Sequence, residues 1–344
     1  MSSPCRQFFE LGQTCFNRGD YDSALRHFGE VIACARAEGN TVYELRAMSW
    51  IPVVLFNASQ WEATIRASRQ FQERARELGQ PHQASWAKVH ELEARAKLDL
   101  RTDWPELKAE LLEGVRAARA ADNSYRALYQ LVRLGGYAAR VGEFEQARAW
   151  LEEALAGIDR RASRSNYLLY NIYAYLCRLM LWLGKPAEAR RHARRCRAAA
   201  EKEGNLILIA DADLCLAQAE CDLGHAGRAL NIAEQVLSQS LQLNWGSEEG
   251  EAQVIRAEVF LATGRVDKAV HAAQRAVEVA GAVHVLEDRV KCLILLGRAR
   301  LAQRRPDEAR YALGEAQRLA AERNYDDHVR TAERLIADMT GPRH

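Results

Sequence analysis

Hydrophobic residues recur along this chain at the spacing of amphipathic helices, in segments that polar turns separate. Residues three or four positions apart share one face of a helix, so a stripe at this spacing marks a face that packs against a neighbour. The stripe is clearest in three triplets: Ala24, Phe28 and Val31; Ala147, Leu151 and Ala154; Ala269, Ala273 and Ala276. The pattern predicts an all-α chain with helices of about 16 residues, or ~25 Å each by helical rise.

A turn signature separates these segments and repeats along the chain. It places a glycine at the end of one helix, the first residue of the next helix two positions later, and an alanine three positions further on. The glycine suits a positive φ, where a Cβ would clash, and the small alanine lets two helices approach closely. The signature begins at Gly19, Gly142, Gly184, Gly224 and Gly264, with degenerate copies at Ser59, Thr102 and Arg304. Successive copies lie 40 to 43 residues apart.

A second set of helix breakers lies between these turns, at Gly39-Asn40, Gly79-Gln80-Pro81, Asp122-Asn123, Gly204-Asn205 and Gly281. Together the two sets predict helix–turn–helix pairs over about residues 4–39, 40–80, 81–122, 123–162, 163–204, 205–244, 245–284 and 285–323. An amphipathic segment over 325–340 is expected to cap the last pair. We therefore predict one domain, 1–344, built as an αα-hairpin solenoid of about eight helix pairs plus a C-terminal capping helix.

Residues 11 to 28 carry a recognisable pattern: Leu11-Gly12, then Gly19-Asp20-Tyr21, then Ala24 and Phe28. This pattern resembles the tetratricopeptide repeat (TPR), and the resemblance covers nearly the whole chain. The period is longer than the common repeat of about 34 residues. It is similar to the long-helix variety in maltose-regulator-type activators and bacterial peptide-sensing regulators. The resemblance implies a right-handed superhelix whose concave groove, lined by the first helix of each pair, binds a protein or peptide.

The resemblance also nominates contact residues, because the family's inward-facing positions can be carried onto this chain. The candidate partner-binding residues are Phe9, Gln13, Phe16, Asn17, Arg46, Phe56, Asn57, Arg140, Arg178 and Trp182. The same positions in the third and fourth copies include Val89, Leu92, Ala96 and Tyr129.

Asn17 and Asn57 occupy one repeat position in successive copies, each beside an inward phenylalanine. An asparagine side chain offers a donor and an acceptor, which match a peptide backbone. The alternative is that each asparagine simply ends its helix favourably before the turn. The resemblance also places basic residues in the first five copies, and Asp211, Asp222, Glu251 and Glu258 in copies six and seven. A groove that is basic in front and acidic at the rear would orient an extended partner.

Charge and composition narrow the classes of partner. The 48 Lys and Arg residues nearly balance the 46 Asp and Glu residues, so net charge predicts neither a nucleic-acid partner nor an acidic membrane surface. The longest apolar runs, such as 51–56, are too short to span a bilayer, and residues 1–6 do not form a basic leader. The eight cysteines show no CxxC pair and no framework spacing, so we predict small core cysteines in a reducing compartment, the cytoplasm.

The sequence holds no motif for a P-loop, a HExxH metalloprotease or a GxSxG hydrolase, so no catalytic residue, cofactor or metal is predicted. His192 and Cys196 have the spacing of a helical metal pair, but Cys196 falls on the predicted buried stripe. The arginine run at 190, 191, 194, 195 and 197 is expected to be a solvated helix face, with an acidic partner as the alternative. Tyr167 and Tyr170 suit either an exposed interface or packing on the preceding repeat.

The prediction for function is a non-enzymatic scaffold that binds a protein or peptide in the concave groove. The alternative is a ligand- or peptide-responsive regulator whose superhelix changes shape on binding and alters a partner such as a transcription or signalling factor. Homodimerisation is left open.

Overall fold

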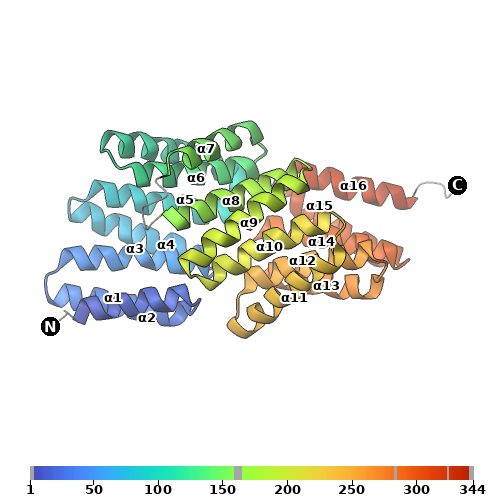
Figure 1. Cartoon of the computed structure of the whole chain (residues 1–344), viewed down its shortest axis with the longest axis horizontal. Coiled ribbons are helices and arrows are strands. Elements are labelled where there is room, and N and C mark those ends of the chain that lie inside the picture. The colour runs from blue at the N-terminus through green and yellow to red at the C-terminus, as the bar shows by residue number, and fades with distance from the viewer. Residues whose placement is uncertain (1–3, 159–164, 283–284, 324, 341–344) are drawn as a thin grey trace. The chain divides into compact units, whose positions relative to one another are not determined.

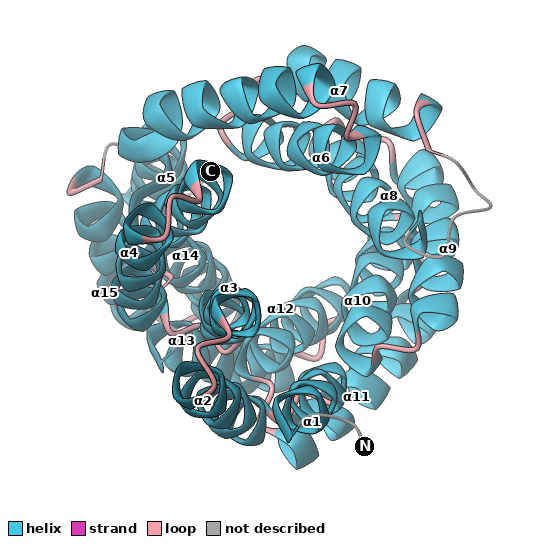
Figure 2. Ribbon diagram, turned by 90° about the vertical axis from the view of Figure 1, so that its left-hand side faces the viewer, coloured by secondary structure: helices cyan, strands magenta, loops and turns pink. Residues whose placement is uncertain are grey.

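The computed structural model describes residues 4–158, 165–282, 285–323 and 325–340, and over these residues every regular element is an α-helix. The predicted all-α fold class is confirmed. Figure 1 shows the helices in chain order, and Figure 2 shows that loops and turns join them directly. The chain forms two compact units, Met1–Leu179 with Arg195–Ile209 and Met180–Arg194 with Ala210–His344. Each unit is described by itself.

The first unit contains seven whole helices and parts of three more. The whole helices are α1 (Pro4–Asn17), α2 (Tyr21–Ala37), α3 (Thr41–Asn57), α4 (Trp61–Glu77), α5 (Pro81–Ala120), α6 (Ser124–Arg140) and α7 (Phe144–Ala156). The shared helices are α8 (Ser165–Trp182), α9 (Pro186–Glu203) and α10 (Leu206–Asp222).

The second unit contains the other parts of these three helices and six further helices. These are α11 (Ala226–Leu243), α12 (Gly246–Ala262), α13 (Val266–Ala282), α14 (Leu286–Ala302), α15 (Pro306–Ala321) and α16 (Asp326–Thr340). Helices pack mainly on their sequence neighbours in both units, and α16 packs on α15 and α14 as a cap. This neighbour-on-neighbour packing is the arrangement of a helical solenoid.

The turn signature adopts the predicted backbone. Gly19 and Gly142 have φ of 76° and 88°, and the next helices begin at Tyr21 and Phe144. The degenerate copies keep the same left-handed conformation without glycine, since Ser59 and Arg304 have φ of 57° and 61°. A left-handed residue at this point lets the chain reverse into the second helix of a pair.

The third copy of the signature departs from the prediction. The turn expected at Thr102 is absent, and α5 instead breaks at Asp99, whose φ and ψ are −152° and 84°. The Asp99 carboxylate accepts hydrogen bonds from the Thr102 backbone N at 3.3 Å and from the Thr102 hydroxyl at 2.9 Å. Asp99 therefore acts as an N-cap, so the second helix starts directly after the first with a kink and no loop.

The Leu-Gly motif is explained by close helix packing within a pair. A Cβ on Gly12 would lie 2.9 Å from the Phe28 ring, and a Cβ on Gly135 would lie 2.5 Å from Leu151 Cγ. Glycine is thus needed where the fully buried side chain of the second helix meets the backbone of the first. The same contact recurs in the second unit between Gly297 and Leu313, at 2.6 Å.

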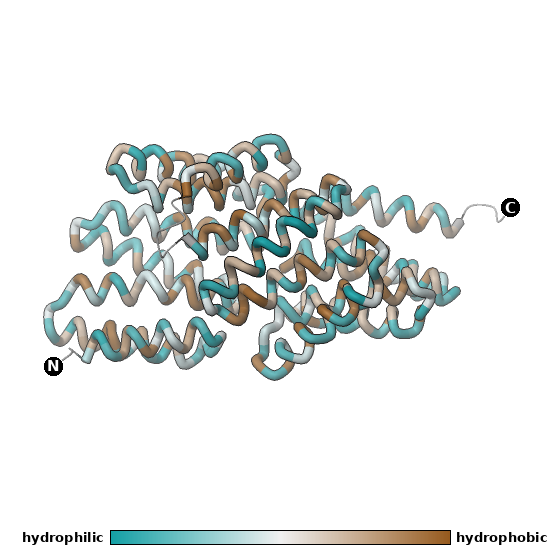
Figure 3. Tube along the Cα trace, viewed as in Figure 1, coloured by the Kyte–Doolittle hydropathy of each residue, from teal (hydrophilic) through white to brown (hydrophobic). Residues whose placement is uncertain are grey.

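Hydrophobic and hydrophilic residues alternate along the helices in Figure 3, as the stripe pattern requires. Among the described residues, no helix combines the length and the apolar character needed to cross a bilayer.

Candidate partner-binding surface

The two predicted phenylalanines of α1 serve the core of the first pair. Phe9 is 2% exposed and meets Phe28 and Trp50 edge-on, with ring centroids 5.5 and 6.3 Å apart. Phe16 is half-buried, with its ring centroid 5.4 Å from that of Trp50. The Arg46 side chain is exposed and lies over Phe9, with its guanidinium carbon 4.2 Å from the ring centroid. Phe9 therefore presents almost no surface to a partner, and Arg46 covers it.

The predicted asparagines end their helices, α1 at Asn17 and α3 at Asn57, and both are exposed. The Asn57 amide nitrogen donates to the Val53 carbonyl of its own helix at 2.8 Å. This bond is the helix-ending interaction that was the alternative to peptide clamping. Phe56 packs edge-on against Trp61 at 5.2 Å, with the Lys97 ammonium 5.5 Å from the Phe56 centroid.

The remaining predicted residues are spread over both units. Gln13, Arg140 and Arg178 are half-buried in the first unit, on α1, α6 and α8. Trp182 is 44% exposed and belongs to the second unit. Partner binding by these residues stays a prediction.

A row of aromatic side chains lies across α5, α6 and α8 in the first unit. Each of these helices begins a helix pair. Trp86 lies 5.4 Å from Tyr129, Tyr125 lies 6.5 Å from Tyr129, and Tyr129 lies 6.3 Å from Tyr167, all between ring centroids. The tyrosine rings of the last two pairs are nearly parallel, at 20° and 18°. Tyr125 is 37% exposed and the other three are half-buried. We call Trp86, Tyr125, Tyr129 and Tyr167 the aromatic row.

A buried arginine lies against this row. The Arg133 guanidinium carbon is 5.3 Å from the Trp86 centroid and 4.9 Å from the Tyr129 centroid. Its Nε donates to Glu93 Oε1 at 2.5 Å, and its Nη2 also contacts the Glu93 carboxylate. Within the described part of the chain, Arg133 Nη1 and His90 Nε2 are buried and have no hydrogen-bond partner. An unsatisfied buried donor is unfavourable, so a rearrangement of the covering side chains that let an acceptor reach Nη1 would be favourable.

The ionisation of these groups follows from their burial. Burial lowers the pKa of Arg133 to about 10, so the guanidinium is still charged at neutral pH. Burial and the neighbouring Arg133 charge hold the pKa of His90 well below its usual value, so the imidazole is neutral. Burial raises the pKa of Tyr129, which stays protonated. The surface therefore offers one charge pair, neutral hydrogen-bonding groups and ring faces, but no activated nucleophile.

The sequence indicated only part of this surface. Tyr129 was among the predicted inward positions, but in the third copy Val89 and Ala96 were predicted and both are buried in the core. Their register was counted back from a turn at Thr102, whereas the first helix ends three residues earlier, at Asp99. Moving the register by that amount leads to Trp86 and Glu93. The sequence signal that would have identified Trp86 and Glu93 was the capping interaction of Asp99 with Thr102, because it marks where the first helix ends.

In the second unit, predicted groove residues form an acidic cluster. Gln218 Nε2 donates to Asp222 Oδ1 at 3.0 Å and to Glu258 Oε2 at 2.9 Å. Burial raises the pKa of both Glu258 and Asp222. The amide of Gln218 thus joins two carboxyl groups, and an acidic rear of the groove stays a prediction.

The arginine run of α9 is mostly a solvated face. Arg191, Arg194, Arg195 and Arg197 are exposed, and Arg197 pairs with Glu201 at 2.6 Å. Cys196 is buried, with its sulfur 3.4 Å from the Tyr170 carbonyl oxygen, so it is a core residue as expected.

The prediction of unpaired cysteines was wrong at one place, because Cys5 and Cys34 form a disulfide. Their separation of 29 residues matches no sequence motif. The antiparallel packing of α1 and α2 places the first turn of one helix beside the last turn of the other.

No family model matches the chain, and no curated protein matches it. Solved structures do match. A Rap protein complexed with competence and sporulation factor has a TM-score of 0.63 at 13% identity, covering 84% of this chain and 80% of that one. The apo form of RapI has a TM-score of 0.51 at 13% identity, covering 81% and 77%.

A signal transduction ATPase with a tetratricopeptide repeat sensor, from Pyrococcus horikoshii, has a TM-score of 0.52 at 16% identity. That match covers 78% of this chain, which spans only 42% of the ATPase. The predicted resemblance is thus confirmed in structure, and the chain has the tetratricopeptide-repeat fold, with structural similarity to Rap proteins.

Proposed function

We propose that this chain is a non-enzymatic protein that binds a peptide or protein segment on the aromatic row and Arg133 of the first unit. One observation carries the proposal: partly open ring faces lie beside a buried guanidinium whose Nη1 has no partner. Rings of this kind supply contact area at small entropic loss, because an aromatic side chain has few rotatable bonds. The unsatisfied N–H supplies direction, because it favours a partner that brings an acceptor.

The chemistry of the row indicates the kind of segment that fits. Apolar or aromatic side chains of a partner can pack on Tyr125 and Tyr129, where a few such contacts can dominate the binding free energy. Once the side chains that cover Arg133 Nη1 move aside, a backbone carbonyl or a carboxylate can accept from it, and this would relieve a donor whose unmet hydrogen bond costs about 1–3 kcal/mol. The Glu93 carboxylate already balances the arginine charge. We therefore infer that a neutral carbonyl suits this point at least as well as an anion.

The comparisons support this proposal at the level of fold. One similar structure is a Rap protein in complex with competence and sporulation factor. Because fold alone does not determine the partner, the assignment to the aromatic row rests on the contacts in this chain.

A peptide-responsive regulator is the second candidate, and the break at Asp99 favours it. Trp86, His90 and Glu93 all lie on the N-terminal side of this break in α5. A partner that pulls on these residues would bend the helix where its backbone is already non-helical. Small-angle scattering separates the two candidates, since a regulator would change its radius of gyration on binding and a scaffold would not.

The test uses random peptides displayed on phage, selected on the wild-type chain and then titrated against purified variants. Tyr129→Ala is the main variant, because Tyr129 touches Trp86, Tyr125 and Tyr167. If Tyr129 is a binding hot spot, its loss weakens the selected peptides by about 30-fold, which corresponds to ~2 kcal/mol.

The matched control is Tyr311→Ala, which removes a tyrosine that is 80% exposed in the second unit. Circular dichroism confirms that both variants are folded. Peptides that bind both variants as tightly as wild type would overturn the assignment to the aromatic row.

Several expectations about partners and location stay predictions. They are the exclusion of a membrane, the exclusion of nucleic acid, the cytoplasmic location and homodimerisation. If the chain is cytoplasmic, the Cys5–Cys34 disulfide must form against thiol systems that keep most cysteine pairs there reduced.

A further inference from the structure

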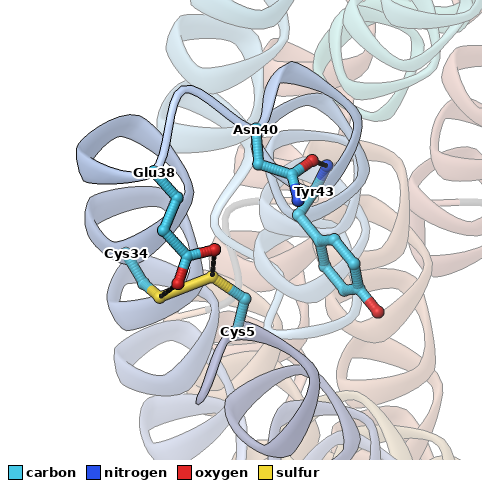
Figure 4. The surroundings of a disulfide bond; sticks show 5 residues. All are labelled: Cys5, Cys34, Glu38, Asn40 and Tyr43. Carbon is cyan, nitrogen blue, oxygen red and sulfur yellow. Dashed lines mark hydrogen bonds between the residues drawn. A yellow bond between two sulfur atoms is a disulfide. The ribbon is translucent and has the colours of Figure 1, made fainter. Parts of the chain in front are cut away.

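The Cys5–Cys34 pair lies at one end of the first helix pair, together with a carboxylate (Figure 4). Cys5 is buried in the first turn of α1, Cys34 is half-buried in the last turn of α2, and Glu38 follows as the C-cap of α2. Glu38 Oε2 lies 3.5 Å from Cys5 Sγ, and Glu38 Oε1 lies 3.5 Å from Cys34 Sγ. Three potential metal-ligand atoms therefore lie within 4.8 Å of one another.

The backbone holds Glu38 firmly in this place. Its N–H donates to the Cys34 carbonyl at 3.0 Å. Two residues later, Asn40 caps the next helix, α3, and its Oδ1 accepts from the Tyr43 backbone N at 3.2 Å. Figure 4 shows the Glu38 side chain directed at the two sulfurs. The carboxylate is thus positioned by the end of α2 and the capped start of α3.

The disulfide does not explain this carboxylate. A disulfide has no S–H to donate, so both oxygens of Glu38 face sulfur lone pairs. Among the described residues, Glu38 also forms no ion pair with a lysine or arginine, unlike the neighbouring Glu44, which pairs with Arg36 and Arg74. A negative group that faces two sulfurs at equal distances suits a reduced state, in which thiols donate to it or a cation joins all three.

The distances fit a tetrahedral zinc ion. With Zn–S of about 2.3 Å and Zn–O of about 2.0–2.2 Å, tetrahedral angles place sulfur and oxygen about 3.5–3.7 Å apart. The two observed sulfur–oxygen distances are 3.5 Å, each to a different oxygen of Glu38. To bind one zinc ion, the sulfurs must move to about 3.8 Å apart once their bond is broken, and the carboxylate must turn to present one oxygen to the ion.

We propose that Cys5, Cys34 and Glu38 form a zinc site that exists only when the disulfide is reduced. A phosphine reductant and one water break the S–S bond, leaving two thiols and a phosphine oxide. Zn²⁺ then binds the two sulfurs and the Glu38 carboxylate, and the two thiol protons pass to solvent. Water fills the fourth position, since Glu38 is exposed. Two thiolates favour Zn²⁺ over Mg²⁺ or Ca²⁺, which prefer oxygen ligands.

The site would fasten the N-terminal helix in both redox states. Helix α1 packs mainly on α2, with further contacts to α3, and its first turn is tied to α2 by the disulfide. Reduction without metal opens this tie, and zinc closes it again.

The experiment uses the full chain with Co²⁺ as a spectroscopic probe and Zn²⁺ as a competitor. The chain is reduced with a phosphine, desalted without oxygen and titrated. We expect one equivalent of Co²⁺ to bind with thiolate-to-cobalt charge-transfer absorption, and Zn²⁺ to displace it. The unreduced chain should show no such absorption.

Variants separate this site from the other thiols. Cys34→Ser should abolish the absorption, and Glu38→Gln should weaken binding at least tenfold. Cys15→Ser removes a half-buried cysteine of α1 outside the cluster and should leave the titration unchanged. Because Cys34 is only half-buried, its variant should fold, and circular dichroism checks this. The proposal is overturned if the reduced wild type gives no charge-transfer band, or if Cys34→Ser retains it.

Discussion

Removal of one partner from the buried Arg133–Glu93 pair should destabilise the first unit far more than removal of both. Arg133 and Glu93 are 7% and 4% exposed, so each charge is almost completely taken from water. In Arg133→Met the carboxylate of Glu93 stays buried without its counter-ion. A break of this kind costs about 3–5 kcal/mol, and the lost contacts of the guanidinium with two rings add to it.

The double variant Arg133→Met/Glu93→Leu should recover most of this loss. Replacing a buried ion pair with apolar side chains of similar volume is often neutral or stabilising, so we expect a free energy of unfolding within about 1 kcal/mol of wild type. The coupling free energy between the two positions should then be about 3 kcal/mol or more.

Chemical denaturation followed by far-ultraviolet circular dichroism measures these free energies. The control is Arg116→Met, which breaks an exposed pair with Glu113 at 2.6 Å and should cost less than about 1 kcal/mol. The reasoning would be refuted if Arg133→Met were as mild as this control, or if the double variant lost as much as the two single variants together.

Two further predictions test other contacts. A Cβ on Gly136 would lie 2.5 Å from Tyr175 Cζ, so Gly136→Ala should lower the free energy of unfolding by about 1–2 kcal/mol even after its gain in helix propensity. A Cβ on Gly29 would meet nothing within 4 Å, so Gly29→Ala should instead stabilise the fold by up to about 1 kcal/mol. If both substitutions changed the free energy of unfolding in the same direction, the packing argument would be contradicted. Burial raises the pKa of Glu258, so its support of the fold is present at low pH and is lost as pH rises through its folded-state pKa. Glu258→Gln should therefore raise Tm at neutral pH with an advantage that vanishes in acid, and a lower Tm at neutral pH would contradict this.

The repeat pattern was sufficient to predict the fold, because the signals that specify it are local. A glycine such as Gly142 ends a helix through its own backbone conformation, and an alanine such as Ala147 marks the close approach of two helices. Each repeat carries these signals within its own residues, so the all-helical arrangement of pairs followed from the sequence alone. Even Gly12, which is required by the buried Phe28, was visible in the pattern of residues 11 to 28.

The candidate sites depended on contacts that no local pattern carries. The cap at Asp99 moved the inner face of α5 by three residues, and the aromatic row therefore includes Trp86 instead of Val89. Cys5 meets Cys34 and Glu38 only because α1 runs antiparallel to α2 and α3 follows a short capped turn. The sequence alone determined the helices and their order, apart from the break within α5, because turns and hydrophobic stripes depend on neighbouring residues. Tertiary packing decided which side chains meet, because a shift of a fraction of a helical turn changes the face that each residue presents.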